Sequence, residues 1–189
     1  MKLGTLTTAI ILTLGVAHSA SAVSTGTINF EGNITDATCE VAVDGDSTGN
    51  TTVKLPEVNK SALATANSTT GGVLFTMTLS GCTLGTDVPV TKAAAFFQAG
   101  DTVDLATGRL KQTATTGAAE NVSLEVYDPE NANAPIKVGY ASQVDSSTYK
   151  AISTSGSTDL HYGVRYYAEG AAATAGKVTS KVVYNLMYK

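Results

Sequence analysis

The sequence predicts an all-β domain, folded as an antiparallel sandwich of the immunoglobulin type. The first reason is that apolar and polar residues alternate with a period of two in short runs, and turn residues separate these runs. The second is composition: the chain has no Trp and only 15% charged residues, and helical periodicity is nearly absent. No sequence period of 20–50 residues indicates a solenoid. The 189 residues suffice for one domain with a core.

The first 22 residues have the features of a secretory signal peptide. Lys2 supplies a short basic region, Ala9–Val16 is apolar, and Ala20–Ala22 has the A-x-A form of a cleavage site. The apolar run is too short to span a bilayer. We therefore expect residues 1–22 to be removed and the mature chain to begin at Val23.

Three segments open the mature chain. Residues 25–34 alternate clearly, with apolar residues and glycines on one face and polar residues between them. Cys39–Val43 is predicted to be a short strand, and turn residues follow at Asp44–Asp46. Residues 53–58 are predicted to form an irregular edge segment, because Pro56 lacks the N–H that a central strand would use.

Further strands are predicted wherever the alternation returns. The segment 60–66 is predicted to be a loop or a single helical turn, and Gly170–Gly176 consists of small residues typical of a flexible loop. The predicted strands are residues 73–79, 93–97, 122–126 and 160–166, with shorter ones near Leu110 and at 136–138.

The last predicted strand spans residues 177–189, and the chain ends on it. One face carries Val178, Ser180, Val182, Tyr184, Leu186 and Tyr188. Nothing follows in the sequence that could pair with its second edge. A long, apolar and unpaired edge strand promotes aggregation unless something else occupies that edge. The central question of this sequence is therefore what lies beside its last strand.

Two cysteines, Cys39 and Cys82, are present in a chain that we expect to be exported. A single disulfide is the expected outcome in an oxidising compartment. It would close a loop of about 44 residues and contribute about 4 kcal/mol in the chain-entropy model. A metal-binding or nucleophilic thiol would need histidine or acidic neighbours, and the sequence offers no obvious arrangement of that kind.

Composition and motifs argue against other classes of protein. The net charge is −4 and no basic cluster is present, so nucleic acid is not an expected partner. His161 follows Asp159 by two residues, but there is no G-x-S-x-G, no H-E-x-x-H and no pair of carboxylates in a catalytic context. We therefore predict neither enzymatic activity nor a cofactor or metal. The tyrosines of the last two strands could form a sugar-binding platform, but their alternation favours packing within the sheets.

Four features together resemble the subunits (pilins) of chaperone–usher fimbriae, close to the type 1 major subunit. The resemblance covers essentially the whole mature chain. The features are an F-x-G-x-hydrophobic motif at Phe30–Ile34, the Cys39 and Cys82 pair, the run Arg165–Ala171 (RYYAEGA), and a C-terminal signature with Gly176 fourteenth from the end and a penultimate Tyr188. Each feature alone is weak, whereas all four in order behind a signal peptide are specific.

The resemblance implies an incomplete immunoglobulin-like sandwich that lacks its last strand and is completed by donor-strand complementation. Residues 23–34 would be the donor strand, and residues 35–189 would be the pilin domain. The implied donor residues are Ile28, Phe30, Gly32 and Ile34. The implied acceptor groove, which also binds the chaperone, lies along Gly176, Val178, Val182, Tyr184, Leu186 and Tyr188.

The resemblance also implies a function. The chain would be a structural subunit that polymerises by donor-strand exchange into the shaft of a fimbria, which is used in bacterial adhesion outside the cell after export through the periplasm. The implied partners are neighbouring copies of the subunit, a periplasmic chaperone and an outer-membrane usher, with a host-surface receptor as a further candidate. The alternatives are a minor adaptor subunit or a subunit that binds a carbohydrate or receptor directly.

Overall fold

The computed structural model describes residues 27–189 as two units, one ending at Gly32 and the other spanning Asn33–Lys189. The predicted signal peptide and the first residues of the predicted donor strand, 23–26, lie outside the described residues. Residues 27–32 contain no helix or strand. In the described part of the chain, no helix is both long enough and apolar enough to cross a membrane.

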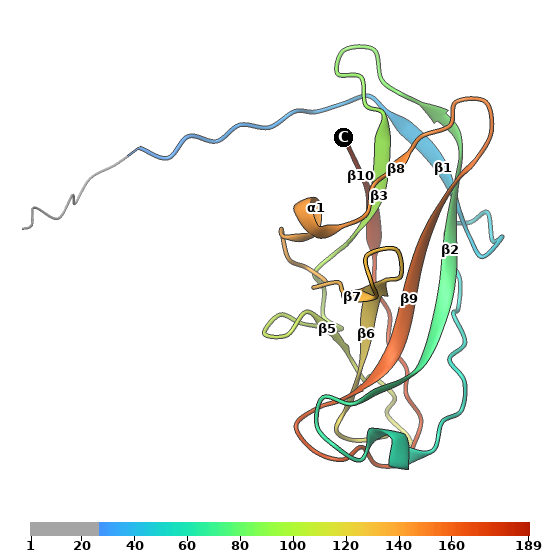
Figure 1. The fold of residues 1–189 in the computed structure, drawn as a ribbon, viewed down its shortest axis with the longest axis vertical. Helices are drawn as coiled ribbons and strands as arrows, with labels where there is room; N and C mark the ends of the chain where they lie inside the picture. Colours follow the sequence, from blue (N-terminus) through green and yellow to red (C-terminus); the bar gives the residue numbers. More distant parts are fainter. Residues whose placement is uncertain (1–26) are drawn as a thin grey trace, which may run out of the picture. The chain divides into compact units, whose positions relative to one another are not determined.

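The second unit consists of two antiparallel sheets (Figure 1). The larger sheet has the order β1-β2-β9-β6-β5-β4, with β7 also paired to β6, and the smaller has the order β10-β3-β8. The strands are β1 Thr38–Val43, β2 Thr69–Thr83, β3 Lys92–Phe97, β4 Val103–Asp104, β5 Arg109–Lys111, β6 Val122–Asp128, β7 Ala134–Pro135, β8 Lys150–Ala151, β9 Thr158–Ala168 and β10 Tyr184–Tyr188, and the helices are η1 Lys60–Leu63 and α1 Gln143–Ser146.

The alternation predicted the main strands correctly, because each has one face in the core. On β2, for example, Met77 and Leu79 are fully buried and Leu74, on the opposite face, is exposed. The strand near Leu110 and the helical turn η1 are also present. The short helix α1 was not predicted.

The core lies between the two sheets. Met77 and Leu79 of β2 and Leu160 and Tyr162 of β9 meet Phe97 of β3. The rings of Phe97 and Tyr162 pack edge to face, with centroids 5.1 Å apart and an interplanar angle of 89°. This is the preferred geometry for aromatic pairs. The predicted sandwich therefore has its core where the inner faces of β2, β3 and β9 converge.

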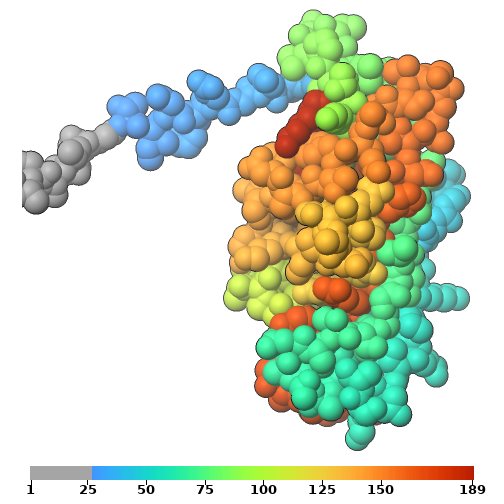
Figure 2. Space-filling view, viewed as in Figure 1, coloured from blue at the N-terminus to red at the C-terminus, as the bar shows by residue number. Residues whose placement is uncertain are grey.

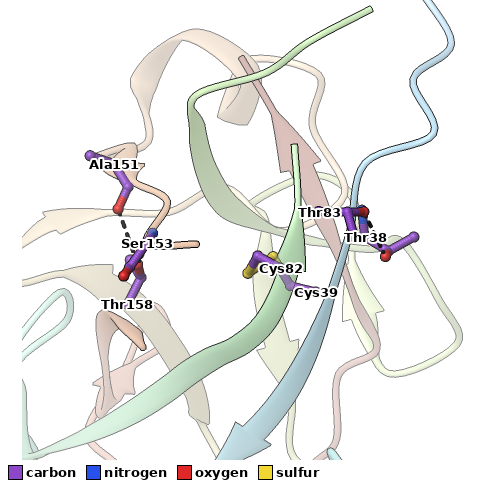
Figure 3. The surroundings of a disulfide bond; sticks show 7 residues. All are labelled: Thr38, Cys39, Cys82, Thr83, Ala151, Ser153 and Thr158. Carbon is purple, nitrogen blue, oxygen red and sulfur yellow. Dashed lines mark hydrogen bonds between the residues drawn. A yellow bond between two sulfur atoms is a disulfide. The ribbon is translucent and has the colours of Figure 1, made fainter. Parts of the chain in front are cut away.

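A disulfide joins Cys39 of β1 to Cys82 of β2 and confirms the predicted pairing (Figure 3). Beside it, the hydroxyl oxygens of Thr38 and Thr83 lie 3.2 Å apart, within hydrogen-bond distance. β1 is the edge strand of the larger sheet. The covalent link therefore fixes this edge strand to its one neighbour.

On the outer face of the larger sheet, the ring of Tyr127 lies across a glycine of the neighbouring strand. A Cβ atom at Gly163 would collide with this ring, and one at Gly72 would come within 3.1 Å of the Tyr127 hydroxyl. The Arg165 guanidinium lies 4.9 Å from the ring centroid and forms a 2.6 Å ion pair with the buried Glu125. The ring thus covers sheet backbone that has no side chain of its own.

Candidate functional site: the open groove beside the last strand

The C-terminal segment forms a shorter strand than the sequence predicted. Regular pairing with β3 covers only Tyr184–Tyr188. Residues 178–183 precede it without forming a regular strand, and the Thr113 N–H donates to the Thr179 carbonyl at 2.8 Å. The partner here is a connecting segment rather than a strand, because β3 ends at Phe97.

The predicted inner face of this segment is confirmed, but it is only half-buried. The apolar residues on it pack against the core cluster, yet none is among the fully buried residues. All six predicted positions share this intermediate burial: Val178, Ser180, Val182, Tyr184, Leu186 and Tyr188. In the space-filling view the end of the chain (dark red) reaches the surface (Figure 2). This apolar face therefore lacks cover along one side.

The backbone of β10 has a free edge. The Val183 carbonyl accepts from the Gln98 N–H at 2.8 Å, and the Lys189 N–H donates to the Lys92 carbonyl at 2.9 Å. Because the backbone N–H and C=O groups of successive residues point to opposite sides of a strand, those of the odd-numbered residues point toward β3. Those of the even-numbered residues point away from it. No other strand of the described chain pairs with β10. The N–H and C=O groups of Tyr184, Leu186 and Tyr188 thus face an edge without a partner strand.

The opposite border of the smaller sheet is closed by side chains. The buried amide of Gln143 pairs with both backbone groups of Phe97, accepting from its N–H and donating to its carbonyl at 2.9 Å each. The hydroxyl of the buried Tyr162 accepts from the Ala95 N–H at 2.7 Å. The two sides of β3 therefore differ, since its backbone at Ala95 and Phe97 is paired with side chains, whereas β10 on its other side has a free edge.

A second segment with free backbone faces the C-terminal residues. Val53 and Leu55 are half-buried against the core cluster. Residues 51–58 form no backbone–backbone hydrogen bond with any described residue. Their one hydrogen bond to the described chain comes from the Tyr166 hydroxyl to the Pro56 carbonyl, at 3.2 Å. This segment matches the predicted irregular edge piece, but the sequence did not indicate its place beside the last strand.

Two cavities mark where this segment and the C-terminal residues face each other. One, of about 300 Å³, is lined by Val58 and Val178 among others. The other, of about 540 Å³, lies mainly along β1 and the turn at residues 47–49, and Tyr184 also lines it. The two segments therefore run antiparallel. We call the space between them the open groove, with residues 49–58 as one wall and residues 178–188 as the other.

Gly176 stands where the C-terminal segment begins. A Cβ atom here would collide with the backbone of Ala118 and Ala119. The contact is close because Lys177 pairs with this segment, its carbonyl accepting from the Ala119 N–H at 3.0 Å and its N–H donating to the Gly117 carbonyl at 2.7 Å. Only glycine permits this approach without a shift of backbone. Gly176 thus fixes where the groove wall at residues 178–188 begins.

Tyrosine hydroxyls lie along the groove. The Tyr184 hydroxyl donates to the Gly49 carbonyl at 2.9 Å. Burial raises the pKa of Tyr184, Tyr166 and Tyr188 above the ordinary value. These hydroxyls are therefore protonated at physiological pH, and those of Tyr184 and Tyr166 donate to backbone carbonyls. All three side chains are half-buried against the core cluster, as expected for packing within the sheets.

The predicted donor residues lie outside any helix or strand. Ile28, Phe30 and Ile34 expose 77%, 90% and 94% of their surface. At Gly32, no heavy atom of the described chain lies within 4 Å of the place a Cβ would take. Three large apolar side chains at alternate positions are therefore available for contact with another surface.

The histidine that we considered for catalysis lies on the exposed face of β9. His161 Nδ1 is 3.2 Å from the Thr76 hydroxyl. The Asp159 carboxylate accepts from the Thr78 hydroxyl at 2.7 Å. In the described part of the chain, no group of three or more His, Cys, Asp or Glu residues could hold a metal ion.

Comparison with known families identifies the chain. The family model described as type-1 fimbrial protein, A, matches residues 55–189, which include all of the groove wall at residues 178–188 and the last part of the wall at residues 49–58. The chain belongs to this family. It is a structural subunit of a chaperone–usher fimbria, as the sequence motifs predicted. Membership also implies assembly with other pilin subunits and a place in an extracellular fimbrium.

Individual relatives agree with this assignment. The major fimbrial subunit SMF-1 of Stenotrophomonas maltophilia (strain K279a) is 39% identical over 176 residues, covering 93% of this chain and 99% of that protein. The crystal structure of the P pilus rod subunit PapA has a TM-score of 0.59 at 18% identity, covering 80% of this chain and 99% of the other. A subunit from a chaperone–usher pilus structure concerned with rod uncoiling has a TM-score of 0.55 at 19% identity, covering 90% and 99%. The two structures support the predicted fold.

Proposed function

We propose that this subunit polymerises by donor-strand exchange, with residues 23–34 of one copy inserted into the open groove of the next. The supporting observation is the groove itself. Its two walls, at residues 49–58 and 178–188, carry backbone groups without partners above a half-buried apolar face. An extended strand between them would satisfy the backbone of both walls and cover that face.

The exposed apolar residues of the N-terminal segment fit this role energetically. Ile28, Phe30 and Ile34 would each contribute roughly 1.5–3 kcal/mol on burial. Each added backbone hydrogen bond would contribute about 0.5–1.5 kcal/mol net. Because the inserted strand also completes the fold of the acceptor, binding and folding are linked. Gly32 would lie where a wall of the acceptor's groove, or the apolar face beneath it, comes closest to the donor backbone.

An empty groove exposes apolar surface and a free strand edge, which together promote aggregation. We therefore propose that a periplasmic chaperone covers the groove first, by adding a strand of its own along the β10 edge, and that an outer-membrane usher directs the exchange during export. We assign the chain to the main shaft rather than to a minor adaptor. Its similarity to a major fimbrial subunit and to a rod subunit supports this assignment.

The test is deletion of residues 23–34 from the mature chain, expressed with its chaperone and usher. The variant retains the groove and should still bind the chaperone, but it should end fibre growth, as measured by fibre length in electron micrographs. Gly32→Leu should block assembly while export continues. Gly100→Leu is a matched control, since no described heavy atom lies within 4 Å of a Cβ at either glycine. Long fibres from the deletion variant would contradict the donor assignment.

A further inference from the structure

The wall at residues 49–58 is held in place by side chains rather than by a sheet. Residues 51–58 make no backbone–backbone hydrogen bond to the described chain. Two tyrosine hydroxyls instead bind carbonyls near its two ends. Tyr184 donates to Gly49 at 2.9 Å, and Tyr166 donates to Pro56 at 3.2 Å. The two bonds come from opposite sheets, since Tyr184 begins β10 and Tyr166 belongs to β9.

The Gly49 end of the wall belongs to a firmly held turn. The Asp46 carboxylate accepts from the Thr48 N–H at 2.9 Å and from the Thr48 hydroxyl at 2.7 Å. Gly49 has a φ of +72°, and a Cβ atom there would lie 3.1 Å from the Tyr184 hydroxyl oxygen. The turn thus presents a fixed carbonyl, with space left for the phenol that binds it.

The Pro56 end is positioned by the ring of Tyr166. A Cβ atom at Gly71 would come within 2.8 Å of this ring and within 3.0 Å of the Val58 side chain. The ring therefore packs beside Val58, two residues beyond the carbonyl that its hydroxyl binds. Tyr166 lies on β9, which pairs with strands on both sides and offers a rigid base.

We propose that Tyr184 and Tyr166 are positioning residues for the donor strand. Their hydroxyls hold the wall at the separation from β10 that one strand fills, so that the free backbone groups of both walls are ready to pair. Tyr184 belongs to the inner face, so its bond to Gly49 persists when a strand pairs with the β10 edge. Prior ordering of a binding site lowers the entropic cost of binding and slows release. This inference rests on the proposed function, because the separation matters only if a strand enters.

The experiment uses the full mature chain, refolded with a fluorescent peptide of residues 23–34. Peptide release is followed after addition of excess unlabelled peptide, and amide hydrogen exchange is measured in parallel. The variants are Tyr184→Phe and Tyr166→Phe, which remove one hydroxyl each. Tyr149→Phe is the matched control, since its hydroxyl also binds a single carbonyl, that of Val144 at 3.1 Å.

Each of the two groove variants should release the peptide about five-fold faster than wild type, the effect of one lost hydrogen bond. Amides of residues 51–58 should exchange faster, while those of β2 and β9 should not change. The control should behave like wild type. Release within two-fold of wild type, or faster exchange spread evenly over β2 and β9, would overturn the positioning role. If wild type binds no peptide, the proposed function fails, and unchanged exchange in residues 51–58 of the two variants would then separately refute the role of the hydroxyls.

Discussion

The hydroxyl oxygen of Tyr162 accepts a 2.7 Å hydrogen bond from the backbone N–H of Ala95, across the core between the two sheets. Tyr162 comes from β9 of the larger sheet and Ala95 from β3 of the smaller one. The short strand β8 pairs only with the start of β3. Beyond it, the Tyr162 hydroxyl makes a hydrogen bond with β3 that a further strand would otherwise make. A core residue thus satisfies part of a sheet border.

Replacing Tyr162 by Phe should destabilise the protein at neutral pH. The change leaves the buried Ala95 N–H without an acceptor, which costs about 1–3 kcal/mol. The concentration of guanidinium chloride at the midpoint of unfolding, measured on the assembled protein, should fall accordingly. Tyr149→Phe, whose hydroxyl is outside the core, serves as the control. An unchanged midpoint for Tyr162→Phe would mean that the hydrogen bond contributes nothing net.

The same tyrosine should make the protein sensitive to alkali. Burial raises the pKa of Tyr162 to about 12, from an ordinary value of 10.0. Because the folded state favours the neutral phenol, its contribution is complete below pH 10 and is lost as the pH rises toward 12. At pH 11 the loss is about 1.4 kcal/mol. Denaturation at pH 8 and pH 11 should therefore show a smaller gap between wild type and Tyr162→Phe at the higher pH.

Substitution of Gly176 by Ala should weaken the fold at the start of the groove wall. The added methyl collides with the backbone at Ala118 and Ala119, which cannot move without breaking the pairing of Lys177. Overpacking of this kind costs about 1–3 kcal/mol. Gly100→Ala, at a site open to solvent, should have little effect. Equal denaturation midpoints for the two variants would show that the segment adjusts freely.

Gly163 and Tyr127 should be strongly coupled. Gly163→Ala alone should cost about 1–3 kcal/mol, because the new methyl displaces the ring that lies over this position. In a Tyr127→Ala background the ring is absent, and the same change should be neutral or stabilising, since alanine is less costly than glycine in a strand. A double-mutant cycle of unfolding free energies measures the coupling. Additive effects would contradict the overlap.

Much of the fold could be predicted because period-two alternation depends only on an extended backbone with one face in the core. This is why the inner face from Val178 to Tyr188 was correct even though β10 covers only its last part. The length of the strand was wrong because it depends on the partner, and β3 ends at Phe97. Contacts between residues that are far apart in the chain leave no pattern in the local sequence from which the end of a strand could be predicted.

The groove wall at residues 49–58 was missed for a related reason. Pro56 argued against a strand, and residues 51–58 indeed pair with no strand of the described chain. Their place depends on Tyr166 and Tyr184, which lie more than a hundred residues further along the chain. The two-residue spacing of Val53 and Leu55 is the one local sign that this segment has an inner face. The role of Gln143 could not be predicted at all. Nothing in the sequence shows that a side-chain amide will be buried and will pair with the backbone at the edge of a strand.

The closure of one sheet border by Tyr162 and Gln143 has a geometric consequence. A subunit whose smaller sheet had free edges on both sides could accept two donor strands at once, and the polymer could branch. Because the Ala95 N–H and both backbone groups of Phe97 are already paired, this part of β3 offers no free edge, and an inserted strand would pair with β10. Polymerisation by the proposed strand insertion at β10 would therefore give an unbranched fibre, in which each subunit accepts one neighbour.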